Sequence, residues 1–183
     1  MSKQEFDDFL NTQIDNNQNE SAIDWDKIRD KWLEQLALFY KDIGNFLADY
    51  EKAKKLSYQF SKKDIFEESI GSYSVQIMDI QLGKHKVRLE PIGTNIISAD
   101  GRIDLIGANG KVKLVLVNKN FSAPSTIKVT LSTENEQGLD NQESDNTEKF
   151  ELAWKIATPP PHIKYIDLNQ DVFFDALLEV VGG

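Results

Sequence analysis

The chain has 183 residues, of which 40% are hydrophobic and 28% are charged, a composition typical of one globular domain rather than a fibrous or disordered protein. It contains no cysteine, which excludes disulfides, thiolate metal sites and cysteine nucleophiles. No run approaches the ~18 apolar residues of a membrane helix, and the net charge of −9 makes the average surface repel nucleic acids and anionic membranes.

The first element that we expect is a short helix after Ser2. Ser2 and Glu5 have the spacing of a capping box. Apolar side chains then recur at helical spacing, at Phe6, Phe9, Leu10 and Ile14. The same residues lack the basic and apolar regions of a secretion signal, so we expect a cytoplasmic protein.

The strongest pattern in the sequence predicts a long amphipathic helix from Trp25 to Ala53, capped by Asp24. Its apolar positions fall within an arc of roughly 140°. One broad, aromatic-rich face requires one partner surface, and a sheet is the natural candidate. These positions are Trp25, Ile28, Trp32, Leu36, Phe39, Tyr40, Ile43, Phe46, Leu47, Tyr50 and Ala53.

A basic cluster between Lys52 and Lys63 has two interpretations. Its lysines are interleaved with Tyr58 and Phe60, as in some nucleic-acid contacts. Lysines near the C-terminus of a helix also complement the helix dipole. We favour the second interpretation and do not expect a nucleic-acid partner.

From Tyr73 onward, helical spacing gives way to the alternation of strands, with Tyr73, Val75 and Ile77 on one side of the first strand. The turn signals that follow are too closely spaced for crossover helices, so the sheet should be mostly antiparallel. We expect strands within 72–82, 85–93, 95–98, 102–107, 111–117, 126–132 and 150–157.

A C-terminal helix is expected after the proline-rich connection at Pro159 to Pro161. Asn169 can cap it. Its apolar side is formed by Val172, Phe173, Ala176, Leu177 and Val180. The chain therefore predicts a single α+β domain over 1–183, with the long N-terminal helix packed on a sheet of six to eight strands.

Within this domain, residues 1–57 form the helical part and 169–181 the C-terminal helix. The antiparallel sheet occupies 58–168. It is interrupted near 133–148 by an acidic stretch without aromatic residues, which we interpret as a mobile loop.

The stretch from Gly101 to Lys119 contains Asn109–Gly110, a strong signal for a hairpin with a type I′ turn. A loop of these two residues would place Leu105 opposite Leu114 and Ile103 opposite Leu116. The core face would then hold Ile103, Leu105, Val112, Leu114 and Leu116. On the other face, Asp104 would lie diagonally from Lys113 as an exposed charge pair, a contact worth at most ~1 kcal/mol.

The same hairpin resembles the catalytic core of the PD-(D/E)xK nuclease superfamily, in which an aspartate and a following Glu-x-Lys hold a divalent ion. The resemblance implies metal-dependent cleavage with Asp104 and Lys119 as catalytic residues. The sequence departs from the motif at Val117, which replaces an anionic ligand that a hard cation needs. The superfamily also continues with a helix, whereas the residues after Lys119 predict a loop and a strand.

Another acidic pair, Glu67–Glu68, allows two interpretations. It can be a solvated pair beside the start of a strand, which we favour, or part of a carboxylate pair like that of a glycosidase. Only two histidines occur, and we expect no metal or cofactor.

By elimination, we expect a non-catalytic, cytosolic protein-binding module that acts as an inhibitor or adaptor. The acidic balance favours a basic protein partner, because complementary fields raise association rates. The alternatives are a divergent or inactive nuclease of the type described, and a small-ligand-binding domain with a cavity between the long helix and the sheet.

Overall fold

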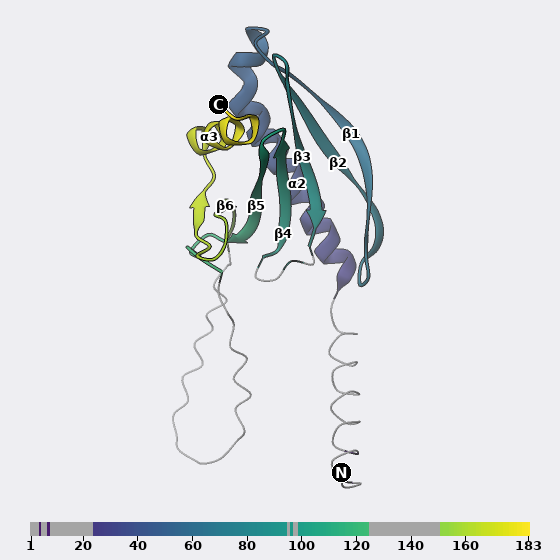
Figure 1. Cartoon of the computed structure of the whole chain (residues 1–183). Coiled ribbons are helices and arrows are strands. Elements are labelled where there is room, and N and C mark those ends of the chain that lie inside the picture. Colours follow the sequence, from purple (N-terminus) through teal and green to yellow (C-terminus); the bar gives the residue numbers. More distant parts are fainter. Residues whose placement is uncertain (1–3, 5–6, 8–23, 95, 97–98, 125–150) are drawn as a thin grey trace.

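The structure is a computed structural model that describes residues 4, 7, 24–94, 96, 99–124 and 151–183. It has the predicted α+β fold: a long helix, an antiparallel sheet of seven strands in the described residues, and a short C-terminal helix (Figure 1). The helices are α2 (Trp25–Lys52) and α3 (Gln170–Val181). The strands are β1 (Ser57–Glu67), β2 (Gly71–Leu82), β3 (His85–Gly93), β4 (Gly101–Gly107), β5 (Gly110–Asn118), β6 (Leu152–Ala157) and β7 (Tyr165–Asp167).

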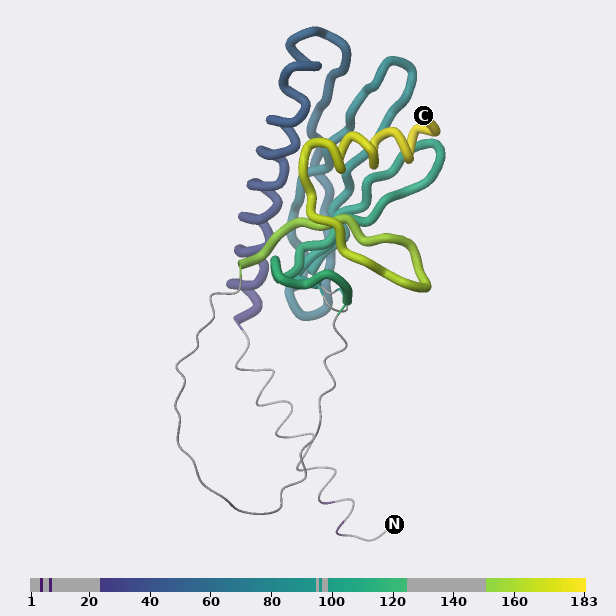
Figure 2. Tube along the Cα trace, turned by 90° about the vertical axis from the view of Figure 1, so that its left-hand side faces the viewer, coloured from purple at the N-terminus to yellow at the C-terminus, as the bar shows by residue number. Residues whose placement is uncertain are grey.

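The strands follow each other across the sheet in chain order, each antiparallel to its neighbour. Helix α2 lies across one face of this meander (Figures 1 and 2). The side chain of Asp24 accepts a hydrogen bond from the Lys27 backbone N–H at 3.0 Å, which confirms the predicted cap. The buried positions of α2 are Trp32, Leu36, Phe39, Ile43 and Leu47, all on the predicted apolar face.

Helix α3 packs against β3, β4 and β5, and its buried side chains join the same core as those of α2. Asn169 caps it through a bond from the Val172 backbone N–H at 3.0 Å, as predicted. The C-terminal end of α3 is tied to the β4–β5 turn, because the Asn109 N–H donates to the Val180 carbonyl at 2.9 Å. The buried residues of α3 are Phe173, Ala176, Leu177 and Val180.

Two strands were not identified from the sequence pattern. Of the basic cluster, only Lys52 lies in α2, at its last residue. Lys54 and Lys55 lie in the connection that follows, and Lys62 and Lys63 lie in β1, which begins five residues after Lys52. As an edge strand, β1 exposes most of its side chains, and Ile65 is its buried position, so it shows little hydrophobic alternation. Strand β7 has three residues, too few to form a pattern.

The alternation predicted for β2 holds from Tyr73 to Ile77 and then changes. Met78, expected on the polar side, is fully buried, and the four residues from Ile77 to Ile80 are all buried. Strand β2 pairs with β3 from Met78 onward, so this half has neighbours on both edges. There Arg88 of β3 covers Asp79 on the face away from α2.

The predicted register of the β4–β5 hairpin is wrong by two residues. Gly107 pairs with Gly110, so the loop consists of Ala108 and Asn109. Gly110 has a φ of 144°, while neither Ala108 nor Asn109 has the positive φ that a type I′ turn would require. Because a shift of two residues keeps every side chain on its face, the predicted core face of the hairpin is confirmed: Ile103, Leu105, Val112, Leu114 and Leu116 are buried.

Some predicted elements lie outside the described residues. These are the strand at 126–132, the loop at 133–148 and, apart from two helical residues, Gln4 and Asp7, the first helix. Of the strand predicted at 95–98, only Ile96 is described, in an isolated bridge with Ala99. No helix in the described ranges is long and apolar enough to cross a membrane.

Candidate functional site

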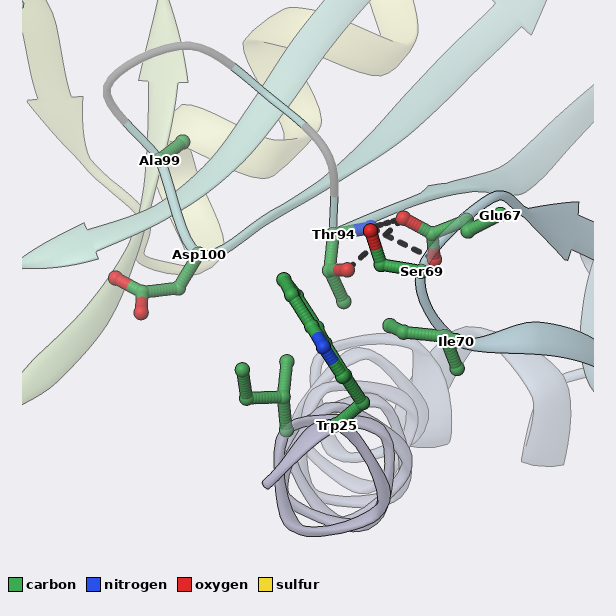
Figure 3. A pocket seen from close by; sticks show the side chains of 8 residues that line it. Trp25, Glu67, Ser69, Ile70, Thr94, Ala99 and Asp100 are labelled. Carbon is green, nitrogen blue, oxygen red and sulfur yellow. Dashed lines mark hydrogen bonds between the residues drawn. The ribbon is translucent and has the colours of Figure 1, made fainter. Parts of the chain in front are cut away.

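A pocket of about 290 Å³ lies where three segments meet near the N-terminal end of α2 (Figure 3). The first turn of α2 forms one wall, the β1–β2 turn a second, and the connection between β3 and β4 a third. The pocket is lined by Trp25, Ile28, Glu67, Ser69, Ile70, Thr94, Ala99 and Asp100. We call it the Trp25–Asp100 pocket.

Glu67 joins two of these walls. Its carboxylate accepts the Thr94 backbone N–H through both oxygens, at 3.2 and 3.0 Å, and the Thr94 hydroxyl at 2.9 Å. The Tyr73 hydroxyl donates to the same carboxylate. Burial, and then the hydrogen bond to and charge of Glu67, raise the pKa of Tyr73. Glu67 is therefore a positioning residue that ties the β1–β2 turn to the β3–β4 connection.

The residue before Thr94 shows how closely the chain wraps this carboxylate. Gly93 has a φ of 140°, and a Cβ at this position would lie 3.0 Å from the Glu67 carboxyl carbon. Only glycine adopts this conformation readily, and a larger residue would also press against Glu67.

The opposite side of the pocket combines an aromatic ring with a second carboxylate. Trp25 is the first residue of α2, directly after the Asp24 cap. In Figure 3 its indole ring is seen edge-on between Asp100 on one side and Ser69 and Ile70 on the other, and the Asp100 carboxylate points away from the ring.

Asp100 is held in place through its main chain and leaves its side chain open. Its backbone N–H donates to the Leu116 carbonyl at 2.8 Å. Its side chain is exposed and has no hydrogen bond or ion pair with another described residue. An aromatic ring and an open carboxylate that line the same pocket suit an organic cation, which the ring and the negative charge both attract.

The face of the sheet away from α2 presents a different environment, because its acids are already paired. Each of four carboxylates pairs with a basic side chain at 2.8 Å or less. These pairs are Lys63–Glu90, Arg88–Asp79, Arg102–Asp104 and Lys155–Asp167. These four acids are therefore not available as unpaired carboxylates for a basic partner.

Asp104, one of the two residues implied by the nuclease resemblance, belongs to this paired group. It is 2% exposed and accepts hydrogen bonds from Arg102 Nε and Nη2, at 2.6 and 2.8 Å, and from Lys111 Nζ at 3.0 Å. Burial raises the pKa of Asp104, but the bonds from Arg102 and Lys111 outweigh it, so the pKa is lower than usual. The predicted exposed pair with Lys113 is wrong, since Asp104 is buried and bonds other bases.

The structure does not bring Asp104 and Lys119 together. Lys113 lies opposite Asp104, and Lys119 is six residues further along the chain, roughly 20 Å at ~3.4 Å per residue. Lys119 Nζ instead bonds Glu151 at 3.1 Å on the surface. In the part of the chain that the structure describes, no three acidic or histidine side chains gather as metal ligands would.

Of the pocket residues, the sequence identified only Glu67 as a possible functional residue, and the favoured interpretation was a solvated acid. Trp25 and Ile28 were expected only as apolar positions of the long helix. The carboxylate is instead partly buried and bonded to Thr94, 27 residues away. No local spacing predicts such a contact, because it depends on where the two turns meet. Because Trp25 directly follows the cap Asp24, the sequence predicts that it begins a helix. Nothing in the sequence indicates that it lines a pocket.

Comparison with protein-family models, curated proteins and solved structures finds no match to this chain, so the geometry of the site carries the functional argument.

Proposed function

We propose that this chain is a non-catalytic, cytoplasmic protein-binding module that acts as an inhibitor or adaptor for a basic partner. The Trp25–Asp100 pocket would receive a lysine or arginine side chain of that partner. The observation that carries the proposal is that an indole face and an open carboxylate line one pocket.

The expected contacts are of known strength. A cation over an indole face gains about 0.5–2 kcal/mol. An ion pair at the surface adds up to about 1 kcal/mol. The Glu67 carboxylate lines the same pocket and adds negative potential, although its oxygens already accept bonds from Thr94 and Tyr73.

The distribution of charge favours the same kind of partner. Residues 1–23 and residues 125–150 each carry a net charge of −4, so the remaining residues of the chain have a net charge of −1. The two acidic segments would accelerate the approach of a basic protein through long-range attraction. A short-range site is then needed to select one partner, and the Trp25–Asp100 pocket supplies it.

One observation favours a small organic cation as the second candidate ligand. The pocket volume of about 290 Å³ lies near the lower limit of small-molecule sites. A free amine and a lysine side chain carry the same cationic group. The two candidates therefore differ in whether the rest of a protein chain adds to binding. The nuclease alternative gains no such support, because Asp104 already bonds two basic side chains.

Calorimetric titration of the full chain tests the proposal. The probes are a lysine-rich peptide, an arginine-rich peptide, a glutamate-rich peptide and butylamine. We expect binding of the two basic peptides and a loss of about fivefold or more in affinity in Asp100→Asn and in Trp25→Ala. The matched control is Asp140→Asn, which removes the same charge from the segment 125–150 and should change affinity by less than about twofold.

Equal weakening by Asp100→Asn and Asp140→Asn would show that only net charge matters, and would contradict the pocket. Butylamine binding as tightly as the lysine-rich peptide would favour the small-ligand candidate over a protein partner.

A further inference from the structure

Strand β1 forms a long open edge of the sheet. It has eleven residues, and in the described part of the chain it pairs with β2 alone. The opposite edge, β7, has three residues. Figure 1 shows β1 along the outer border of the sheet. Open edges of this length carry unpaired N–H and C=O groups and are sites of strand addition unless they are protected.

The side chains along this edge form a regular pattern. Phe60, Lys62, Asp64 and Phe66 are alternate residues, so they lie on the same side of the strand. All four are exposed, Phe60 by 44% and Phe66 by 73%. The Phe60 ring packs edge-on against Tyr40 of α2 and against Tyr58, and the rest of its surface stays open. Phe66 is the more exposed ring, and an edge that only avoided association would not need it.

The pattern is complementary to itself. If a second β1 runs antiparallel with Lys63 at the centre, Lys62 lies opposite Asp64 of the second copy, and Phe60 lies opposite Phe66. The two-fold symmetry repeats each pair, which gives two opposite-charge pairs and two aromatic pairs on one side of the new ladder. We propose that two copies of this chain pair through their β1 edges into a continuous sheet.

The other side of the strand tolerates this arrangement. The two Lys63 residues would face each other at the axis, but each directs its Nζ back to Glu90 of its own chain at 2.6 Å. Ile65 is buried and would lie opposite Ser61 of the second copy. No like charges on this side therefore remain uncompensated.

The charges also select the register. The backbone N–H and C=O groups that point outward from β1 belong to alternate residues, so a competing antiparallel register is shifted by two residues. In one direction this shift places Lys62 opposite Lys62 of the second copy, in the other it places Asp64 opposite Asp64, and both separate Phe60 from Phe66. Like charges directly opposite each other are unfavourable, so the lysines that discourage random edge pairing favour one register.

The contacts set the expected affinity. Each cross-strand pair contributes roughly 0.2–1 kcal/mol beyond the backbone hydrogen bonds. Strand pairing also buries a small area compared with the interface of an obligate dimer. We therefore expect a dimer with a dissociation constant in the micromolar range.

Sedimentation velocity of the full chain over a range of concentrations tests the proposal through a charge exchange. Lys62→Asp places an acidic side chain opposite Asp64 of the second copy, and Asp64→Lys places a basic side chain opposite Lys62. Each variant should therefore weaken the dimer about tenfold or more. The control is Lys84→Asp, which changes the same charge in the exposed β2–β3 turn and should leave the dimer unchanged.

An equimolar mixture of the two variants should dimerise again, because each acidic side chain at these positions in one chain then faces a lysine in the other. Circular dichroism of each variant checks that the fold is kept, as Asp64 also accepts a bond from Ser74 within the chain. A wild-type chain that stays monomeric would overturn the proposal. So would a dimer that Lys62→Asp leaves intact, or two folded variants that fail to associate when mixed.

Discussion

Glu67 and Thr94 lie 27 residues apart in the chain, and three hydrogen bonds join the carboxylate of one to the backbone and hydroxyl of the other. This contact closes the Trp25–Asp100 pocket on one side. It links a turn at the edge of the sheet to the connection that carries Asp100. The shape of the pocket therefore depends on a residue that need not touch a ligand.

Glu67→Gln should lower the free energy of unfolding by about 1–3 kcal/mol. The amide has one oxygen where the carboxylate had two, so a donor of Thr94 or Tyr73 loses its acceptor. Urea unfolding measures the change. Glu68→Gln is the matched control, because Glu68 is exposed, and it should change stability by less than about 0.5 kcal/mol. Equal effects of the two substitutions would refute the structural role of Glu67.

Two glycines should respond to alanine in opposite directions. A Cβ at Gly107 would lie 2.3 Å from the Val180 carbonyl oxygen, so Gly107→Ala must displace α3 and should cost about 2 kcal/mol or more. At Gly44, within α2, a Cβ would meet the Tyr58 hydroxyl at 3.5 Å, an ordinary contact. Gly44→Ala should therefore stabilise the protein by about 0.5–1 kcal/mol. Thermal unfolding of both variants checks the signs, and a stabilising Gly107→Ala would mean that α3 does not pack as described.

Asp104→Asn should have a pH-dependent effect on stability. The pKa of Asp104 is lower in the folded than in the unfolded chain, so its stabilisation is present above the unfolded pKa and is lost as the pH falls through the folded pKa. At about pH 7 we expect a loss of roughly 1–3 kcal/mol, since Arg102 and Lys111 lose a charged partner. The loss should shrink below about pH 4.

Urea unfolding of the wild type and of Asp104→Asn at several pH values measures this dependence. Asp30→Asn serves as the control, because Asp30 pairs with Arg29 on the exposed surface of α2. It should show a small effect at every pH. A loss in Asp104→Asn that stays constant from neutral to acid pH would contradict the depressed pKa.

Lys155 is expected to hold the chain segment after β5 in place. Its side chain is 6% exposed, and its Nζ donates to the carbonyls of Lys119 and Phe121, at 2.7 and 2.9 Å, and pairs with Asp167. Lys155→Met removes these donors and keeps the length of the side chain. We expect faster hydrogen exchange at residues 119–122 and a loss of about 1–3 kcal/mol. Unchanged exchange in this segment would argue against the role.

The helices and the faces of the β4–β5 hairpin could be predicted because their signals are local. Asp24 and Asn169 cap their helices through residues three positions away, and apolar spacing defines the buried faces. The hairpin register was missed because both glycines flank the loop, which leaves Ala108 and Asn109 at its centre. The error of two residues preserved the core face but changed the residue opposite Asp104, which is Lys113 rather than Val115.

The remaining features depend on contacts between distant segments. Strand β1 resembled a solvated helix end, because an edge strand needs little hydrophobic alternation. The Trp25–Asp100 pocket combines three segments that the sheet brings together, and none of them carries a recognisable motif. Among the described residues, Asp100 can be recognised as an unpaired carboxylate only when the structure shows that acids such as Asp79 and Asp104 are paired.

The most direct measurement of the proposed function follows the indole N–H signals of the three tryptophans in a nitrogen–proton NMR spectrum. Trp32 and Trp154 pack against each other in the interior, with ring centroids 5.9 Å apart, so their signals serve as internal references. The spectrum of Trp25→Phe assigns the third signal, because it lacks only the Trp25 indole. Titration of the full chain with a lysine-rich peptide should shift the Trp25 signal in a saturable manner and leave the other two in place. Binding of the peptide without a shift at Trp25, or equal shifts of all three signals, would contradict the account.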